Sequence, residues 1–223
     1  MKIKATRYLL LIYFGALLIF SYGCEKSVVN GLVDIDGNVY DTVVIGTQVW
    51  MTENLRTTRL NDRAEIALVP DGNEWKNLTI PGYCWYGNNE AFFSLNHYGA
   101  LYNRYAVQTG KLCPAGWHVP DNDDWDELSL YVGWDAGGGK LKEAGTVNWA
   151  EPNTDATNET GFAALPGGYR NAYYEDYQRF RYRACFWSSS YPPSFELNNY
   201  DSNVSSRPSR AQNDGVSVRC IKD

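Results

Sequence analysis

The sequence predicts a single α+β domain in which short strands are joined by long loops. Aromatic residues make up 15% of the 223-residue chain, with 17 Tyr and 8 Trp. The 20 glycines and repeated Asn/Asp-Gly turns favour short strands separated by loops. Only two methionines are present, one of them the initiator, and leucine content is modest, which argues against a helical bundle. About 200 residues can bury a substantial core within one domain.

The chain begins with a basic start followed by an uncharged apolar run. Lys2, Lys4 and Arg7 carry the positive charge, and residues 8–23 carry none. At about 1.5 Å per residue the run reaches only about 24 Å, less than the roughly 30 Å core of a bilayer. The pattern therefore predicts a removable export signal over residues 1–23.

The cysteine behind this run is predicted to carry a lipid. Ser21-Tyr22-Gly23-Cys24 resembles a bacterial lipobox, although serine stands where leucine is usual. Acyl chains on Cys24 would anchor the mature protein in the cell envelope, at the outer membrane, without a spanning helix. The alternatives are an ordinary signal peptide with a chance cysteine, or an uncleaved anchor. Residues 24–32 then form a tether and residues 33–223 the domain.

Removal of the signal leaves an acidic body. Seventeen basic residues remain against 26 acidic ones, a net charge of about −9. Nucleic acids and anionic lipid surfaces repel such a body, so neither is expected as a partner.

The first half of the domain predicts one hairpin and two helices. Val39–Ile45 and Gln48–Met51 flank a Gly-Thr turn and read as a β-hairpin. Apolar residues recur at helical spacing over Tyr98–Val107, which predicts a helix that ends at Gly110. The acidic run at 120–127 lacks the glycine and glutamate that an EF-hand requires. Its acids are instead expected to cap a second helix at Asp121 or Asn122.

The second half predicts loops and short strands. Residues 137–139 and 145–161 are rich in loop-forming residues. Strand candidates follow at Phe162–Leu165, Ala184–Ser188, Phe195–Tyr200 and Val216–Ile221. Four cysteines occur in the body: Cys84, Cys113, Cys185 and Cys220. In an exported protein an even count predicts two disulfides, which can pair in three ways. None has the spacing of a zinc site.

Several segments resemble one bacterial family, the Fibrobacter succinogenes major paralogous domain. They are Asp36-Gly-Asn-Val-Tyr40, Ile45-Gly-Thr-Gln-Val-Trp-Met-Thr-Glu-Asn-Leu55, Tyr98-Gly-Ala-Leu-Tyr-Asn-Arg-Tyr-Ala-Val107, Leu112-Cys-Pro-Ala-Gly-Trp-His-Val-Pro120, Gly161-Phe-Ala-Ala-Leu-Pro-Gly-Gly-Tyr-Arg170, Phe186-Trp-Ser-Ser-Ser190 and Val216-Ser-Val-Arg-Cys-Ile-Lys-Asp223. The resemblance runs in order from about residue 33 to the end. It implies a C-type-lectin-like fold with two helices, short antiparallel strands and long loops, in an exported and often lipid-anchored protein. It implies no established activity.

The resemblance also bears on the cysteines. Cys113 and Cys220 match family positions that look paired. A second bridge, Cys84–Cys185, is predicted without that support, because relatives more often lack a cysteine at the position of Cys185.

Two segments are candidate ligand sites. Glu151-Pro152-Asn153 resembles the triplet that holds Ca²⁺ in calcium-dependent lectins of this fold, and Asn158 adds an oxygen nearby. However, no Trp-Asn-Asp follows, and a turn-rich loop without a metal is the favoured interpretation, so no cofactor is expected. Between positions 169 and 200 eleven aromatic residues are interleaved with arginines, the mixture that sugars and protein partners favour. Trp187 is assigned to the core. The expected ligand contacts are Tyr173, Tyr174, Tyr177, Arg170 and Asn153.

The sequence argues against catalysis. Ser188, Ser189 and Ser190 lack a nucleophile elbow, and His118 lies in a segment that reads as packing. Cys185 and Cys220 are far apart compared with the close cysteine pair of formylglycine-generating oxidases. We therefore expect a non-enzymatic lipoprotein that binds a glycan or protein. The alternatives are an oxidase or hydrolase of related fold, and a structural or adhesive surface protein without a dedicated pocket.

Overall fold

The computed structural model describes residues 31–204 and 209–223. Its elements, in chain order, are β1 (Leu32–Val33), β2 (Val39–Tyr40), β3 (Thr42–Ile45), β4 (Gln48–Met51), β5 (Ala67–Leu68), α1 (Gly72–Lys76), β6 (Gly82–Cys84), η1 (Tyr86–Asn88), α2 (Glu90–Leu95), β7 (Leu101–Tyr102), α3 (Arg104–Gln108), β8 (Trp117–His118), α4 (Asn122–Val132), η2 (Trp134–Ala136), α5 (Gly138–Leu141), β9 (Tyr169–Asn171), β10 (Asp176–Gln178), β11 (Arg183–Trp187), β12 (Ser194–Asn198) and β13 (Ile221–Lys222). The predicted signal peptide and Cys24 lie outside the described residues and stay predictions.

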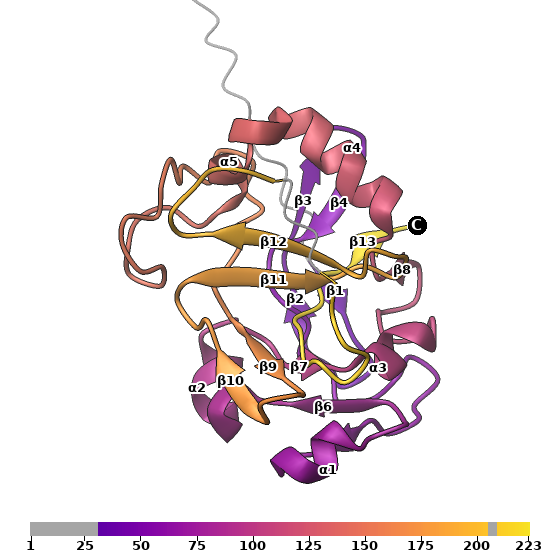
Figure 1. Cartoon of the computed structure of the whole chain (residues 1–223). Coiled ribbons are helices and arrows are strands. Elements are labelled where there is room, and N and C mark those ends of the chain that lie inside the picture. Colours follow the sequence, from indigo (N-terminus) through magenta and orange to yellow (C-terminus); the bar gives the residue numbers. More distant parts are fainter. Residues whose placement is uncertain (1–30, 205–208) are drawn as a thin grey trace, which may run out of the picture.

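These elements form a mixed α and β structure built on small sheets. The β11–β12 hairpin crosses the middle of the molecule, with α4 and α5 at one end and α1 and α2 at the other (Figure 1). The described strands form two-, three- and four-stranded sheets, the largest in the order β3-β4-β13-β8. The α+β prediction is confirmed at this level. Two details were wrong: the described residues contain five α-helices rather than two, and β5 pairs with β6 in parallel.

The predicted hairpin is confirmed as β3 and β4, which join through Gly46 at φ +62°. Val39 and Tyr40 leave this hairpin and pair with β1. Strand β13 closes the same sheet, because Ile221 lies opposite both Trp50 and His118. The strand at the end of the described chain therefore returns beside the N-terminal hairpin.

The disulfide between Cys113 and Cys220 is present. The two residues are 107 positions apart in the sequence. In the chain-entropy model, closing a loop of this length contributes about 4–5 kcal/mol to stability. The pairing that the family resemblance implied is thus confirmed.

The predicted helix over Tyr98–Val107 is wrong in its first half. Tyr98 and Leu101 are buried, but Tyr102 lies in β7 and exchanges backbone hydrogen bonds of 2.9 and 3.0 Å with Val216. Gly99 has φ +71°, and a Cβ there would lie 2.6 Å from the carbonyl oxygen of Leu55. Helix α3 begins only after Asn103, whose side chain accepts a hydrogen bond from the Ala106 amide. Contacts with distant segments therefore outweighed the local helical period.

The predicted helix after the acidic run is confirmed as α4. Asp121 is its N-cap and forms a capping box with Asp124. Its inner face buries Trp125, whose ring stacks on Phe195 with centroids 4.3 Å apart and planes 6° apart. Leu128 and Val132 are buried on the same face, and the core assignment of Trp187 is confirmed, because this residue is wholly buried.

Other predictions in the second half are partly wrong. Strands β11 and β12 occur as expected, but Phe162–Leu165 forms only one bridge, between Ala164 and Lys142. Val216 and Ser217 likewise form isolated bridges instead of a continuous strand. The glycine run begins α5 rather than a loop. A Cβ at Gly139 would lie 2.1 Å from the carbonyl oxygen of Asp155, so glycine permits this close packing.

Candidate functional site

The predicted Cys84–Cys185 disulfide is wrong, because both cysteines are free and buried. Cys84 lies in β6 and packs with Trp75, whereas Cys185 belongs to a different hydrophobic cluster. Burial raises the pKa of the Cys84 thiol to about 11 and also raises that of Cys185. Both side chains are therefore protonated core thiols at neutral pH.

His118 is tied to carboxylates on both sides of its ring. Its Nδ1 lies 2.7 Å from Asp223, and its Nε2 lies 3.1 Å from Asp124. Neither ring nitrogen is left to activate a neighbouring serine in this arrangement. Burial lowers the pKa of His118, but the hydrogen bonds to both carboxylates raise it by more, so the pKa lies above 6.5. The sequence predicted a packing role for the segment around His118. It did not predict that the His118 side chain links β8 to α4 and to Asp223.

In the loop that resembles a calcium site, the side chains of Asn153 and Asn158 form hydrogen bonds with nearby backbone groups. The Glu151–Pro152 peptide bond is cis. Asn153 donates to the carbonyl oxygens of Glu143 and Gly145 at 3.0 and 2.6 Å. Asn158 accepts a hydrogen bond from the backbone amide of Ala163.

This donor set does not suit Ca²⁺. Of the three candidate residues, Glu151 keeps an exposed carboxylate and Asn153 a buried, unpaired Oδ1, whereas Ca²⁺ takes six to eight oxygens. Within the described part of the chain, no cluster of three or more His, Cys, Asp or Glu is placed to hold a metal.

An internal ammonium group anchors this region. Lys142 is fully buried and donates to the carbonyl oxygens of Thr154, Asn198 and Asp201 at 2.8, 3.0 and 2.8 Å. Its Nζ also lies 5.6 Å from the ring centroid of Trp149. Burial lowers the pKa of Lys142 to about 8. Sequence reasoning missed this residue, because nothing in its local sequence marks it as buried.

Arg170 is a core residue, which corrects the prediction that it contacts a ligand. Its side chain donates to the carbonyl oxygens of Val69 and Pro70 at 2.7 and 2.9 Å. The guanidinium lies over the rings of Trp75 and Tyr177, and only 1% of the residue is exposed. Asn153, also expected to contact a ligand, is 5% exposed and holds its own loop.

The three tyrosines predicted to bind ligand are divided between two environments. Tyr173 and Tyr174 lie between β9 and β10 and are 76% and 67% exposed. Their rings meet edge to face at 5.0 Å. Tyr177 is half-buried instead, and its hydroxyl donates to Asn88 at 2.7 Å. Only the first two therefore offer open aromatic faces.

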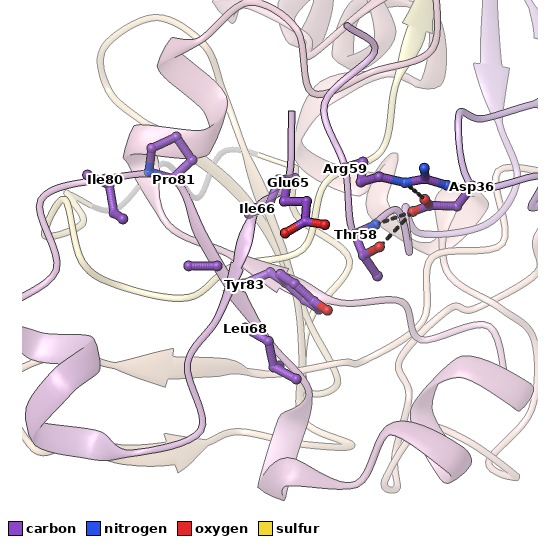
Figure 2. A pocket seen from close by; sticks show the side chains of 10 residues that line it. Asp36, Thr58, Arg59, Glu65, Ile66, Leu68, Ile80, Pro81 and Tyr83 are labelled. Atoms are coloured by element: carbon purple, nitrogen blue, oxygen red, sulfur yellow. Dashed lines mark hydrogen bonds and ion pairs between the residues drawn. The ribbon is translucent and has the colours of Figure 1, made fainter. Parts of the chain in front are cut away.

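A cleft of about 730 Å³ lies beside β5 and β6. Figure 2 shows Asp36 bonded to Arg59 and Thr58 at one side of the cleft, with Ile80 and Pro81 at the other. Burial raises the pKa of Asp36, but hydrogen bonds from Thr58, Arg59 and Thr57 outweigh this and lower the pKa. Most of the charge in the cleft is thus already neutralised by internal partners.

A second hollowed region surrounds Tyr182, which is 51% exposed. The ring lines two hollows of about 350 and 500 Å³. The first is also lined by Thr146, Trp149, Ala150, Glu151 and Arg181, and the second by Tyr86, Gln178, Arg179 and Phe180. We call these residues with Tyr182 the Tyr182 surface. Tyr182 belongs to the aromatic and arginine cluster seen in the sequence, but it was not among the predicted ligand contacts.

A tight turn presents Tyr182. The carbonyl oxygen of Arg179 accepts hydrogen bonds from the amides of Tyr182 and Arg183, both at 3.0 Å. Arg179 and Arg181 have φ of 63° and 69°, in the left-handed region that side chains rarely adopt. Such conformations persist where the surrounding structure enforces them, and they concentrate at functional sites.

Arg181 joins this turn to the loop that precedes the cis peptide bond. Its guanidinium donates to the carbonyl oxygens of Thr146, Val147 and Asn148, each at 3.2 Å. Its own carbonyl oxygen accepts from Ala150 at 2.8 Å. Both walls of the first hollow are therefore held together by one side chain and one backbone bond.

Comparisons with known proteins give one family. The model of the Fibrobacter succinogenes major domain matches residues 43–222. The comparisons with curated proteins and with solved structures gave no match. None of the helices within residues 31–204 and 209–223 is long and apolar enough to cross a membrane.

Proposed function

Because the chain belongs to the Fibrobacter succinogenes major domain family, we propose that it is a cell-envelope lipoprotein whose non-enzymatic domain binds a glycan through the Tyr182 surface. The family match spans most of the chain and leaves the first residues free to act as signal and anchor. Two parts of this proposal are supported by the sequence pattern alone. They are the export signal at residues 1–23 and the lipid on Cys24.

One observation supports glycan binding most directly. The exposed ring of Tyr182 stands between two hollows that both contain polar groups. Sugars stack their C–H faces on such rings and hydrogen-bond with polar side chains beside them. The turn at Arg179 and the bonds of Arg181 hold the backbone that carries Tyr182 before binding, which lowers the conformational entropy that this segment loses when a ligand binds.

We also propose that the fold is C-type-lectin-like. Its support is the return of β13 beside the N-terminal hairpin and the Cys113–Cys220 disulfide near that junction. Long loops lie between α5 and β9, where the first hollow is found. If the fold is C-type-lectin-like, the Tyr182 surface lies on the face of the domain that these long loops form.

A glycan array tests the proposal. We expect the wild-type protein to bind a defined set of saccharides and Tyr182→Ala to lose most of that signal. Tyr131→Ala is the matched control, because Tyr131 is 61% exposed on α4 and lines neither hollow. Equal loss in both variants, or none in either, contradicts a site at Tyr182.

A protein ligand at the β9–β10 hairpin is the second candidate. The exposed pair Tyr173 and Tyr174 favours it, since tyrosines concentrate in the contact patches of protein interfaces. If Tyr173→Ala and Tyr174→Ala remove binding to envelope proteins while Tyr182→Ala does not, this candidate replaces the first. If no variant changes binding to any saccharide or protein, a purely structural or adhesive role is supported.

A further inference from the structure

Three charged side chains line the two hollows beside Tyr182. Arg179 lines one hollow, and Glu151 lines the other together with Arg181, whose guanidinium already donates to three backbone carbonyls. No carboxylate lines the hollow that contains Arg179, and its other walls are Tyr86, Phe180, Gln178 and Tyr182 itself. The Tyr182 surface is therefore electrically asymmetric.

Arg179 differs from the arginines that the structure pairs internally. Arg183, four residues along, forms a 3.1 Å ion pair with the buried Glu196, and Arg59 pairs with Asp36. Within residues 31–204 and 209–223, no hydrogen bond or ion pair occupies the guanidinium of Arg179. Its exposed side chain keeps five N–H donors in a planar fork that matches a carboxylate or sulfate.

Aromatic side chains form the walls of the hollow that Arg179 lines. The ring of Phe180 lies 5.3 Å from that of Tyr86, so the two form one packed wall. The hydroxyl of Tyr169 donates to the side chain of Gln178 and fixes it. A ligand bound in this hollow would displace water from around Arg179. The attraction between the guanidinium and an anionic group of the ligand would then be stronger, because less water screens it.

We propose that the ligand is an acidic saccharide, bound with its anionic group on Arg179 and a neutral sugar across Tyr182 toward Glu151. This inference rests on the proposed function. Glu151 is exposed and can accept hydrogen bonds from sugar hydroxyls, while it repels a second anionic group. The surface thus selects both the charge and the direction of the chain. The acid is a uronic-acid carboxylate or a sugar sulfate, which share the bidentate chemistry of the guanidinium.

The test compares ligands that differ only in charge. Binding of the full-length protein to an oligogalacturonate and to its fully methyl-esterified form is measured by calorimetry, with a sulfated and a neutral galactan as further arms. We expect the free acid to bind at least about tenfold tighter than the ester, equal to about 1.4 kcal/mol. This preference should shrink as salt is raised. Tighter binding of the sulfated galactan than of the oligogalacturonate would identify the acid as a sulfate.

Arg179→Gln should remove the preference for the acid over the ester, because it removes the guanidinium proposed to meet the acidic group. Arg63→Gln is the matched control, because Arg63 is also exposed and also has a positive φ, 73°, in a different part of the domain. Equal affinity of the wild type for charged and neutral forms, with Tyr182→Ala abolishing both, overturns the acidic ligand but keeps the glycan site. If Arg63→Gln removes the preference for the acid as fully as Arg179→Gln does, the preference arises from the overall charge of the protein. That outcome overturns the role of Arg179. If no saccharide in any arm is bound, the proposed function fails as well.

Discussion

The ammonium nitrogen of Lys142 lies 2.8 Å from the carbonyl oxygen of Thr154, in the loop directly after Glu151-Pro152-Asn153. The same nitrogen bonds to the end of β12 and to Asp201. A single side chain from the end of α5 thereby holds three segments that meet behind the first hollow of the Tyr182 surface. The loop is ordered by a cation that the chain itself supplies.

Replacing Lys142 with methionine should destabilise the domain by about 3 kcal/mol or more. The change removes three hydrogen bonds and leaves three buried carbonyl groups without this partner, each loss costing about 1–3 kcal/mol before relaxation. Urea unfolding followed by tryptophan fluorescence measures the change. Lys140→Met is the control, because Lys140 forms only an exposed 3.4 Å ion pair with Glu159. Similar stabilities of the two variants would show that the carbonyls need no internal cation.

Calcium should have no effect on the protein. Asn153 and Asn158 already bond to backbone groups of their own loop, and Lys142 supplies the buried positive charge. Melting temperature and glycan affinity are therefore expected to be the same in excess EDTA and in millimolar Ca²⁺. A rise in melting temperature that saturates with Ca²⁺ would establish a metal site that this donor set does not explain.

Removing the disulfide should cost about 4–5 kcal/mol, because the bridge closes a loop between residues 107 positions apart. The variant is the double change Cys113→Ser and Cys220→Ser, and the measurement is its free energy of unfolding in urea. Cys185→Ala provides the comparison, since it removes a buried sulfur without opening a bridge. If the double variant loses no more stability than Cys185→Ala, the bridge adds nothing beyond packing.

Thiol counting separates the oxidase alternative from a binding domain. In a Cys24→Ser chain, we expect no reaction with Ellman's reagent in the native state. Two thiols per chain should react after unfolding without a reductant. Both free cysteines are buried, and the pKa of Cys84 is about 11, so little thiolate forms near neutral pH. Fast labelling of the folded protein would favour a reactive pair, and no labelling after unfolding would restore the Cys84–Cys185 disulfide.

The ion pairs of His118 should make stability depend on pH. The pKa of His118 is raised in the folded state, so protonated His118 stabilises the fold. This contribution is complete below the unfolded pKa of about 6.5 and is lost as the pH rises through the higher folded pKa. His118→Gln should therefore lose more stability at about pH 6 than at about pH 9 in urea unfolding. His97→Gln, at an exposed histidine that contacts Glu53, controls for loss of an imidazole; an equal pH dependence in both variants would contradict the assignment.

The sequence was sufficient wherever the signal was local. The capping residues before α4, the turn between β3 and β4, and the family positions of Cys113 and Cys220 all lie within short segments. The helix expected over Tyr98–Val107 failed because its burial pattern is satisfied by pairing with Val216, more than 100 residues away. A period shows which residues are buried, but it does not show which backbone partner buries them.

What the sequence by itself determined is the class of the domain, its net negative charge, and an aromatic and arginine-rich segment after residue 169, whereas the export signal that ends before Cys24 stays a prediction. Only the tertiary structure decided which members of that segment face outward. It buried Arg170 against Val69 and Pro70 and left Arg179 and Tyr182 exposed. The reason is physical: exposure depends on which distant carbonyls and rings a side chain meets, and residue type alone does not specify that meeting.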